Sequence, residues 1–383
     1  MTSAQGVGAR RPLRLLGVGV VALVVAGCAP EFVALGPASS PHAHDLTVAP
    51  PIPQVPTTVG VADSDLYGRT AAGVDASIRL MKSAGLRSVR IMVPWAGIER
   101  EPGRYDWSVV DVMIDAAASE GISVLATLNS TPTWAVVPGQ PPIAGRPASA
   151  VAFGRFAGSV AERYRGKVAA YEIWNEPNAT AFFEPAPDPA GYVDLLRASY
   201  LAVKVADPSA VVVAGGLGPL VDRAGVAMDA VKFLEAMYAA GAKNYFDALG
   251  YHPYQYTMKF SEGGYHPDAP MNQIAALRQV MLANGDLRKR IWATEYGEPS
   301  SVAGEEAQSD YLDDMLQKWR SIPYAGPVYL YTLRDRNSLS TDFEDTLGMY
   351  RSDGSAKPSV EVVTSHAATS AVLGKLAAIS APR

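Results

Sequence analysis

Hydrophobic and polar positions change period repeatedly from residue 57 onward. Short runs rich in β-branched residues, such as Ser88–Val93 and Ser123–Leu128, have the pattern of buried strands. Longer stretches between them carry apolar residues three and four positions apart, as in Val151–Tyr164, which predicts amphipathic helices. The other predicted strands are Thr58–Ala62, Val168–Trp174, Ala210–Ala214, Phe246–Gly250, Arg290–Thr294 and Pro327–Tyr331.

Each predicted strand is followed by a predicted helix, and the last helix is expected over residues 359–378. Strands that alternate with helices indicate a parallel sheet, and this count predicts an α/β fold, a (β/α)8 TIM barrel. A doubly wound open sheet is the alternative, and it usually carries a glycine-rich turn after its first strand. The nearest approach here is Gly215-Gly216-Leu217-Gly218, which has the wrong spacing. We therefore expect a single catalytic domain over residues 57–383.

The N-terminal segment has the features of an export signal. Arg10, Arg11 and Arg14 precede an uncharged apolar run, Leu15–Gly27, of 13 residues, which is too short to span a bilayer. The run ends in Val25-Ala26-Gly27-Cys28, which resembles a bacterial lipobox. That resemblance implies that residues 1–27 are a lipoprotein signal peptide and that Cys28 becomes lipidated. An ordinary secretory signal followed by an unrelated cysteine is the alternative.

Residues 28–56 contain seven prolines and predict an extended tether without a core. With a lipid on Cys28, the tether would hold the domain at the outer face of the cell membrane, in the cell envelope. Cys28 is the only cysteine, so no intrachain disulfide can form.

Charge and composition exclude several classes of function. The chain has 33 Lys and Arg against 38 Asp and Glu, and no run of basic residues, which argues against a nucleic-acid partner. His252 is the only histidine at a predicted strand end, so we expect no metal site, and no cofactor motif is present. A serine hydrolase is not indicated, because the GxSxG elbow is absent.

Function in such a barrel gathers at the carboxyl ends of the strands. Two acidic residues stand there, Glu176 after the fourth strand and Glu295 after the seventh. Two carboxyls that face each other across a cleft are the groups that hydrolyse glycosidic bonds, one as an acid and one as a nucleophile. Glu172 is expected to serve a structural hydrogen bond deeper in the barrel, and Glu298 ranks below Glu295 as a nucleophile.

Two motifs link these acidic residues to a particular group of enzymes. Trp174-Asn-Glu-Pro-Asn178 and Thr294-Glu-Tyr-Gly297 resemble the signature of the clan of retaining (β/α)8 glycoside hydrolases, with families 39 and 5 nearest by motif. The segments 98–107 and 347–358 also resemble that clan. The resemblance implies that Glu176 is the acid/base and Glu295 the nucleophile.

The resemblance also implies a set of substrate-binding residues. Asn175 would bind the sugar 2-hydroxyl, Arg90 would keep Glu295 ionised, and Tyr254 would donate to Glu295. Trp95, Asn129 and Trp134 are added because they lie at predicted strand ends, where aromatic faces can stack on sugar rings. The full set is Arg90, Trp95, Asn129, Trp134, Asn175, His252, Tyr254, Tyr331 and Arg334. Many clan members end the eighth strand with a tryptophan that stacks on the sugar. The corresponding stretch of this chain, residues 329–334, has no tryptophan, and we expect Tyr331 or Arg334 to take its place.

The sequence thus predicts a retaining glycoside hydrolase that acts on a β-linked or furanosidic polysaccharide of the envelope, with galactofuran of an actinobacterial arabinogalactan as one candidate. A catalytically silent glycan-binding lipoprotein on the same barrel is the first alternative. A scaffold protein for envelope assembly is the second, and it would expose a large apolar patch.

Overall fold

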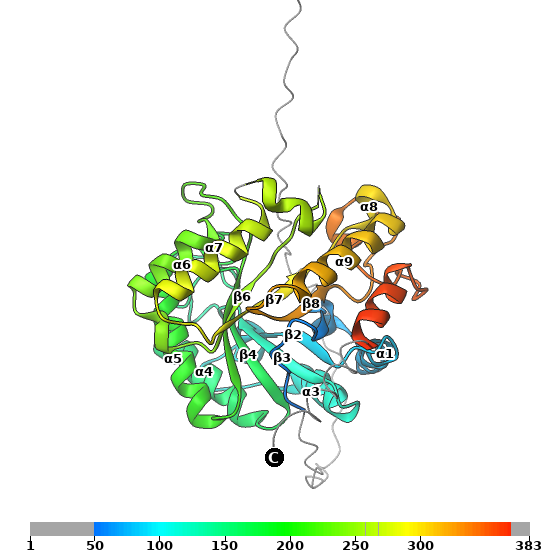
Figure 1. Cartoon of the computed structure of the whole chain (residues 1–383). Helices are drawn as coiled ribbons and strands as arrows, with labels where there is room; N and C mark the ends of the chain where they lie inside the picture. The colour runs from blue at the N-terminus through cyan, green and yellow to red at the C-terminus, as the bar shows by residue number, and fades with distance from the viewer. Residues whose placement is uncertain (1–49, 257, 267, 369–383) are drawn as a thin grey trace, which may run out of the picture. The chain divides into compact units, whose positions relative to one another are not determined.

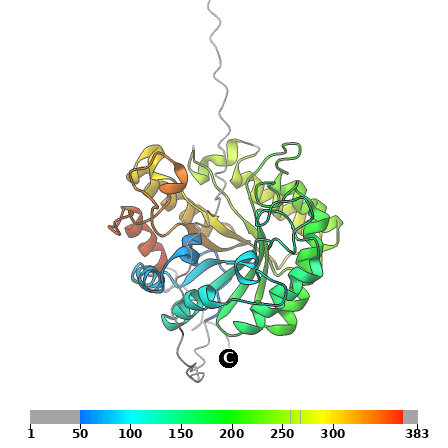
Figure 2. The same ribbon diagram turned by 180° about the vertical axis from the view of Figure 1, so that it is seen from behind.

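The computed structural model describes residues 50–256, 258–266 and 268–368. Eight parallel strands pair in chain order within these residues, and β1 (Val59–Ala62) pairs with β8 (Ala325–Tyr331) to close the barrel. Helices encircle the strands (Figures 1 and 2). The remaining strands are β2 (Ser88–Pro94), β3 (Ser123–Asn129), β4 (Val168–Asn175), β5 (Val211–Leu217), β6 (Ala248–Tyr251) and β7 (Arg290–Tyr296). The predicted TIM barrel is confirmed.

The long helices of the outer layer are α1 (Ala71–Ser83), α3 (Ser108–Ser119), α4 (Ala150–Arg163), α5 (Pro189–Ala206), α6 (Ala230–Ala239), α7 (Pro270–Ala283) and α9 (Glu305–Arg320). Short helices lie in the loops: α2 (Trp95–Ile98), α8 (Ser300–Ala303), η1 (Ser64–Gly68), η2 (Ala242–Asn244), η3 (Phe260–Tyr265) and η4 (Phe343–Asp345). Residues 359–368 are helical, and the rest of the predicted last helix lies outside the described residues.

Two helix starts differ from the predicted ones because polar side chains cap the helices. Thr70 Oγ1 accepts a hydrogen bond from the Gly73 amide, so α1 begins four residues before the predicted Asp75. Asp229 accepts from the amides of Val231 and Lys232, so α6 begins at Ala230 rather than at Val226.

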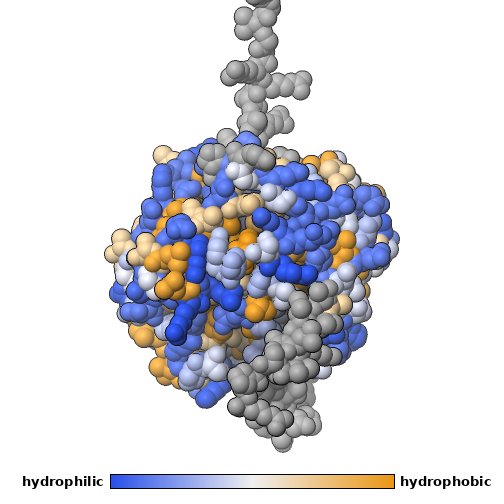
Figure 3. All heavy atoms as spheres, in the orientation of Figure 1, coloured by the Kyte–Doolittle hydropathy of each residue, from blue (hydrophilic) through white to orange (hydrophobic). Residues whose placement is uncertain are grey.

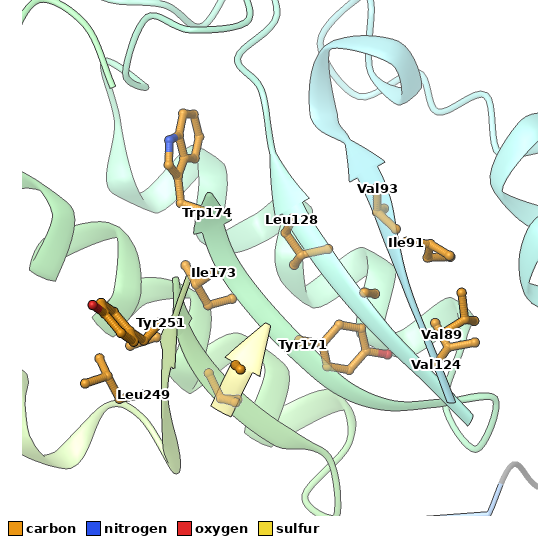
Figure 4. Packing of buried hydrophobic residues seen from close by; sticks show 14 of the residues in the cluster. Val89, Ile91, Val93, Val124, Leu128, Tyr171, Ile173, Trp174, Leu249 and Tyr251 are labelled. Carbon is orange, nitrogen blue, oxygen red and sulfur yellow. The ribbon is translucent and has the colours of Figure 1, made fainter. Parts of the chain in front are cut away.

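Alternation along the strands divides the apolar residues into two layers. Outward side chains, such as Val89, Ile91 and Val93 of β2, pack in the layer between strands and helices (Figure 4). Inward side chains fill the barrel below the mouth, among them Leu125, Ala170, Val213, Trp292 and Tyr329. Trp292 and Trp319 are fully buried, as expected for packing residues.

The N-terminal end of the described chain already contacts the barrel. Ile52, which lies in the predicted tether, is buried with the inward cluster, and Ser123 Oγ donates to Pro50 O. Residues 1–27, Cys28 and the tether up to residue 49 lie outside the described residues. No described helix is long and apolar enough to cross a membrane. Hydrophilic residues dominate the face shown in Figure 3, with apolar patches between them.

Candidate active site

The end of β4 turns two consecutive side chains into the barrel mouth. Strict alternation would place Asn175 and Glu176 on opposite faces of the strand. Trp174 and Glu176 instead have left-handed backbone angles, φ 72° and 43°, which break the alternation. The Trp174 ring packs outward against Phe153 and Phe183, while Asn175 and Glu176 both contact groups inside the mouth. Such angles cost roughly 1–3 kcal/mol each in other proteins and cluster at functional sites.

Asn178 holds this strained turn in place. It is fully buried, its amide nitrogen donates to Gly218 O and Met228 O, and its side-chain oxygen accepts from the Gly218 amide. The β4 loop is thereby fixed to the end of β5. Asn178 lies in the predicted motif, but a sequence alone does not show which loop an asparagine binds.

Glu295, at the end of β7, is surrounded by donors. Arg90 Nη1 donates to its Oε1 at 2.5 Å, and the Tyr254 hydroxyl donates to its Oε2 at 2.9 Å. His252 Nδ1 lies 3.8 Å from Oε2. Burial favours the neutral acid, but His252, Arg90 and Tyr254 outweigh burial and lower the pKa of Glu295 below its usual value. The predicted contacts of Arg90 and Tyr254 with Glu295 are present.

Glu176 has a different environment. It is 6% exposed, and its Oε1 lies 2.8 Å from His252 Nδ1. Its Oε2 is buried without a hydrogen-bond partner among the described residues. Gly218 stands beside it, where a Cβ atom would lie 3.2–3.3 Å from the carboxyl atoms. One oxygen of Glu176 is therefore held by His252, and the other is buried without a hydrogen-bond partner among the described residues.

His252 lies between the two acids. It is fully buried, its Nε2 lies 3.1 Å from Thr294 Oγ1, and a Cβ atom at Gly216 would lie only 2.0 Å from the ring. Burial opposes a charged ring, but Glu295 and Glu176 outweigh burial and raise the pKa of His252. The sequence placed His252 in the sugar-binding floor, and the structure places it against Glu176 and near Glu295.

The separation of the acids follows from this shared nitrogen. His252 Nδ1 is 2.8 Å from Glu176 Oε1 and 3.8 Å from Glu295 Oε2, so those two oxygens can be no farther apart than these distances combined. That limit for one pair of oxygens is compatible with the roughly 5–5.5 Å between the carboxyl groups of retaining glycosidases.

Arg90 organises the floor below the acids. It is 1% exposed, and its Nε donates to Glu172 Oε2 while its Nη2 donates to Asn175 Oδ1, both at 2.7 Å. Thr127 Oγ1 also donates to Glu172. Glu172 thus has the predicted structural hydrogen bond. The Asn175 nitrogen makes no hydrogen bond to a described residue, so it is free to meet a ligand.

The predicted aromatic residues divide into two groups. Trp95 lies in the core and not in the cleft, because α2 turns it against Phe156 and its Nε1 donates to Glu99. The prediction that Trp95 binds substrate is therefore not met. Trp134, in the loop after β3, is 36% exposed, and its Nε1 donates to Glu99 O. Its open ring surface can stack on a sugar.

The polar residues at the other strand ends also differ from one another. Asn129 ends β3 with its Oδ1 buried and unpaired among the described residues. Tyr331, at the end of β8, lies close enough to Glu295 that burial and this charge raise its pKa. Arg334 interacts electrostatically with Asp63, which follows β1, and its Nε is buried without a partner among the described residues. Arg336 instead donates to the Tyr331 hydroxyl at 3.2 Å, and sequence reasoning missed it.

Comparisons with known proteins show which proteins the chain resembles. A family model described as beta-galactosidase, Glyco_hydro_42, matches residues 70–144, about a fifth of the chain, and this span contains neither Glu176 nor Glu295. No curated protein sequence matches the chain.

Solved structures share the barrel. A family 39 glycoside hydrolase from Bacteroides cellulosilyticus WH2 is 23% identical with a TM-score of 0.67, covering 82% of this chain and 65% of its own. A monomeric beta-xylosidase from Caulobacter crescentus CB15 is 19% identical with a TM-score of 0.62, over 82% of this chain and 68% of its own. A GH5_18 protein from Bifidobacterium longum in complex with Manb1-4GlcNAc is 14% identical with a TM-score of 0.62, over 82% and 78%.

These likenesses confirm the predicted resemblance to the (β/α)8 glycoside hydrolases of families 39 and 5 in fold. The chain spans about two thirds of the length of the family 39 protein. Within the described residues, no group of three or more His, Cys, Asp or Glu side chains is arranged to hold a metal ion.

Proposed function

We propose that this chain is a retaining glycoside hydrolase with Glu176 as acid/base and Glu295 as nucleophile. One observation carries the proposal: two buried carboxyls from β4 and β7 face the same mouth and share His252 as a neighbour. The environments of the two acids differ in the way that double displacement requires, because one acid is kept ionised by donors and the other has an open oxygen.

In the first step, Glu295 attacks the anomeric carbon and the bond to the leaving oxygen breaks. Arg90 and Tyr254 hold the attacking carboxylate ionised and oriented. His252 occupies Oε1 of Glu176, so the proton of this acid is carried on Oε2 and passes to the leaving oxygen. The free Asn175 nitrogen, beside Arg90, donates to the sugar 2-hydroxyl, a contact that strengthens in the transition state.

In the second step, Glu176 takes a proton from water as the water attacks the anomeric carbon. The bond to Glu295 breaks, the carboxylate is restored, and the product retains the anomeric configuration. No metal or organic cofactor takes part in this scheme.

The substrate is a β-linked or furanosidic glycan of the cell envelope, with galactofuran as a candidate. The β linkage is supported by the relatives, since one is named a beta-xylosidase and another binds Manb1-4GlcNAc. The furanoside is supported by Tyr331, which stands where many clan members carry a stacking tryptophan.

The envelope location rests on the lipobox-like sequence that ends at Cys28, through which a lipid would anchor the enzyme to the outer face of the membrane. If Cys28→Ala leaves the protein bound to the membrane fraction to the same extent as the native chain, the proposal of a lipid anchor on Cys28 is wrong.

Turnover of aryl glycosides tests the activity. A panel of aryl pyranosides and furanosides should contain at least one substrate that the chain hydrolyses, and proton NMR of the first product should show retained configuration. Saturable glycan binding without turnover would instead support the silent glycan-binding protein.

A further inference from the structure

The loop after β8 builds one wall of the mouth. Arg336 donates to both carboxylate oxygens of Asp65 and to the Tyr331 hydroxyl, which fixes the start of the loop beside the site. Farther along, the Phe343 ring packs against Tyr256 at 5.9 Å. Tyr256 in turn packs against Tyr254, the residue that donates to Glu295. The short helix η4 is thus connected to the nucleophile through two aromatic contacts.

Glu344 lies in that helix, next to Phe343, and its carboxylate makes no hydrogen bond to a described residue. It is partly buried and interacts electrostatically with Glu295, Glu176 and Arg336. Burial and the charge of Glu295 raise its pKa to about 7. Glu344 is therefore a partly buried carboxyl without a hydrogen-bond donor among the described residues, within electrostatic reach of both acids and on the helix whose Phe343 ring contacts Tyr256. Burying such a group without a partner is unfavourable.

We propose that Glu344 determines specificity by accepting a hydrogen bond from a hydroxyl of the sugar bound at the cleavage point. The inference rests on the proposed function and deepens it. Phe343 and Tyr256 supply the rigid support that a recognition residue needs, and Arg336 fixes the other end of the loop. The hydroxyl is one other than the 2-hydroxyl, which Asn175 binds.

The same cluster selects the class of sugar. Glu344 adds negative charge beside Glu295 and Glu176, so a uronic acid meets repulsion. The two arginines that reach these carboxyls are already engaged, because Arg90 binds Glu172 and Glu295, and Arg336 binds Asp65. The site therefore takes a neutral sugar whose hydroxyl groups donate.

A cycle of variants and substrates tests this contact. The aryl glycoside that the native chain hydrolyses fastest is compared with its monodeoxy analogues and its uronic acid counterpart, for the native chain, Glu344→Ala and Glu344→Gln. We expect Glu344→Ala to lower kcat/KM on the parent glycoside about 10- to 100-fold. On one deoxy analogue, the native chain and this variant should react within about threefold of each other, because the contact is missing in both.

The controls separate this contact from a general disturbance. The 2-deoxy analogue should cost both proteins equally, and Asp345→Asn, on the same short helix, should leave the parent rate unchanged. On the uronic acid substrate, Glu344→Gln should react at least about 10-fold faster than the native chain, since one repulsive charge is removed.

Equal losses on every deoxy analogue, or no loss on the parent glycoside, would overturn the role of Glu344 while leaving the proposed function intact. A native chain that hydrolyses no glycoside would overturn both. If Glu344→Ala does not fold, Glu344→Gln and the uronic acid comparison decide the matter, and an unchanged preference between neutral and acidic sugar rejects the inference.

Discussion

The surroundings of Glu295 and Glu176 differ, although both acids are buried at the same mouth. Glu295 accepts hydrogen bonds from Arg90 and Tyr254 on different oxygens. Glu176 contacts only His252 and leaves Oε2 without a partner among the described residues. Hydrogen-bond donors, rather than exposure, distinguish the two acids, because Glu295 is 9% exposed and Glu176 is 6% exposed. Donors stabilise the charged form of an acid, whereas an open oxygen can carry a proton to the substrate.

Removing the charge of Glu295 should have the largest effect. Glu295→Gln keeps the shape of the side chain but cannot form the covalent bond, so kcat should fall by about 10⁴-fold or more. Steady-state kinetics on the best aryl glycoside measure this loss. Glu298→Gln is the matched control, three residues along the chain, and should keep near-native activity. A Glu295→Gln protein with native turnover would refute the assignment of the nucleophile.

Glu176→Ala should show a smaller loss that depends on the leaving group. Proton donation is worth roughly 10²–10⁴-fold for a poor leaving group and little for a dinitrophenolate. Azide should restore turnover of the activated substrate and give a glycosyl azide, because the open position admits a nucleophile that needs no base. The same loss on all leaving groups, without azide rescue, would contradict the acid/base role.

A third carboxyl shows what burial does without donors. Glu298 is 2% exposed, neither oxygen has a partner among the described residues, and burial raises its pKa to about 8. Because the folded protein favours the neutral form of Glu298, this group's contribution to the free energy of unfolding is complete below pH 4.5, the pKa of the carboxyl in the unfolded chain. The contribution is lost as the pH rises through about 8, the pKa in the folded protein. Each pKa unit corresponds to roughly 1.4 kcal/mol, so the loss amounts to a few kcal/mol.

Glu298→Gln should therefore raise the free energy of unfolding at pH 8 and have little effect at pH 4.5. Urea unfolding of both proteins across this range measures the difference. If the stabilisation by Glu298→Gln does not grow with pH, the carboxyl of Glu298 is not held neutral by burial, and the raised pKa is wrong.

Tyr254→Phe should have the smallest effect. It removes one donor from Glu295, so the pKa of the nucleophile rises and the acidic limb of kcat/KM moves to higher pH. We also expect roughly a 10-fold loss at the optimum. Tyr296→Phe is the control, since its ring stacks on Tyr254 but its hydroxyl has no partner among the described residues. An acidic limb that stays in place would mean that Tyr254 does not influence the charge of Glu295.

The sequence predicts the barrel and the two acids because both depend on short-range patterns. Strand and helix periods are local, and the carboxyl ends of parallel strands must meet at one rim. The place of Arg90 beside Glu295 came from the resemblance to the clan, and its position inside β2 agrees with it.

The rest of the site depends on loops and on tertiary contacts. Trp95 was misassigned because α2 turns a strand-end residue into the core. Glu344 and Arg336 lie in an irregular segment after β8, where no period gives a direction to a side chain. Gly218 leaves room for the carboxyl of Glu176, which lies against it. No sequence pattern near residue 218 reveals this contact.

The most direct test of the account is a covalent trap. A fluorinated aryl glycoside of the preferred sugar slows release of the glycosyl-enzyme, and mass spectrometry of the intact protein and its peptides locates the adduct. We expect one sugar attached to Glu295, formed also in Glu298→Gln and absent in Glu295→Gln. An adduct on another residue, or turnover of the native substrate with inversion and no adduct, would contradict it.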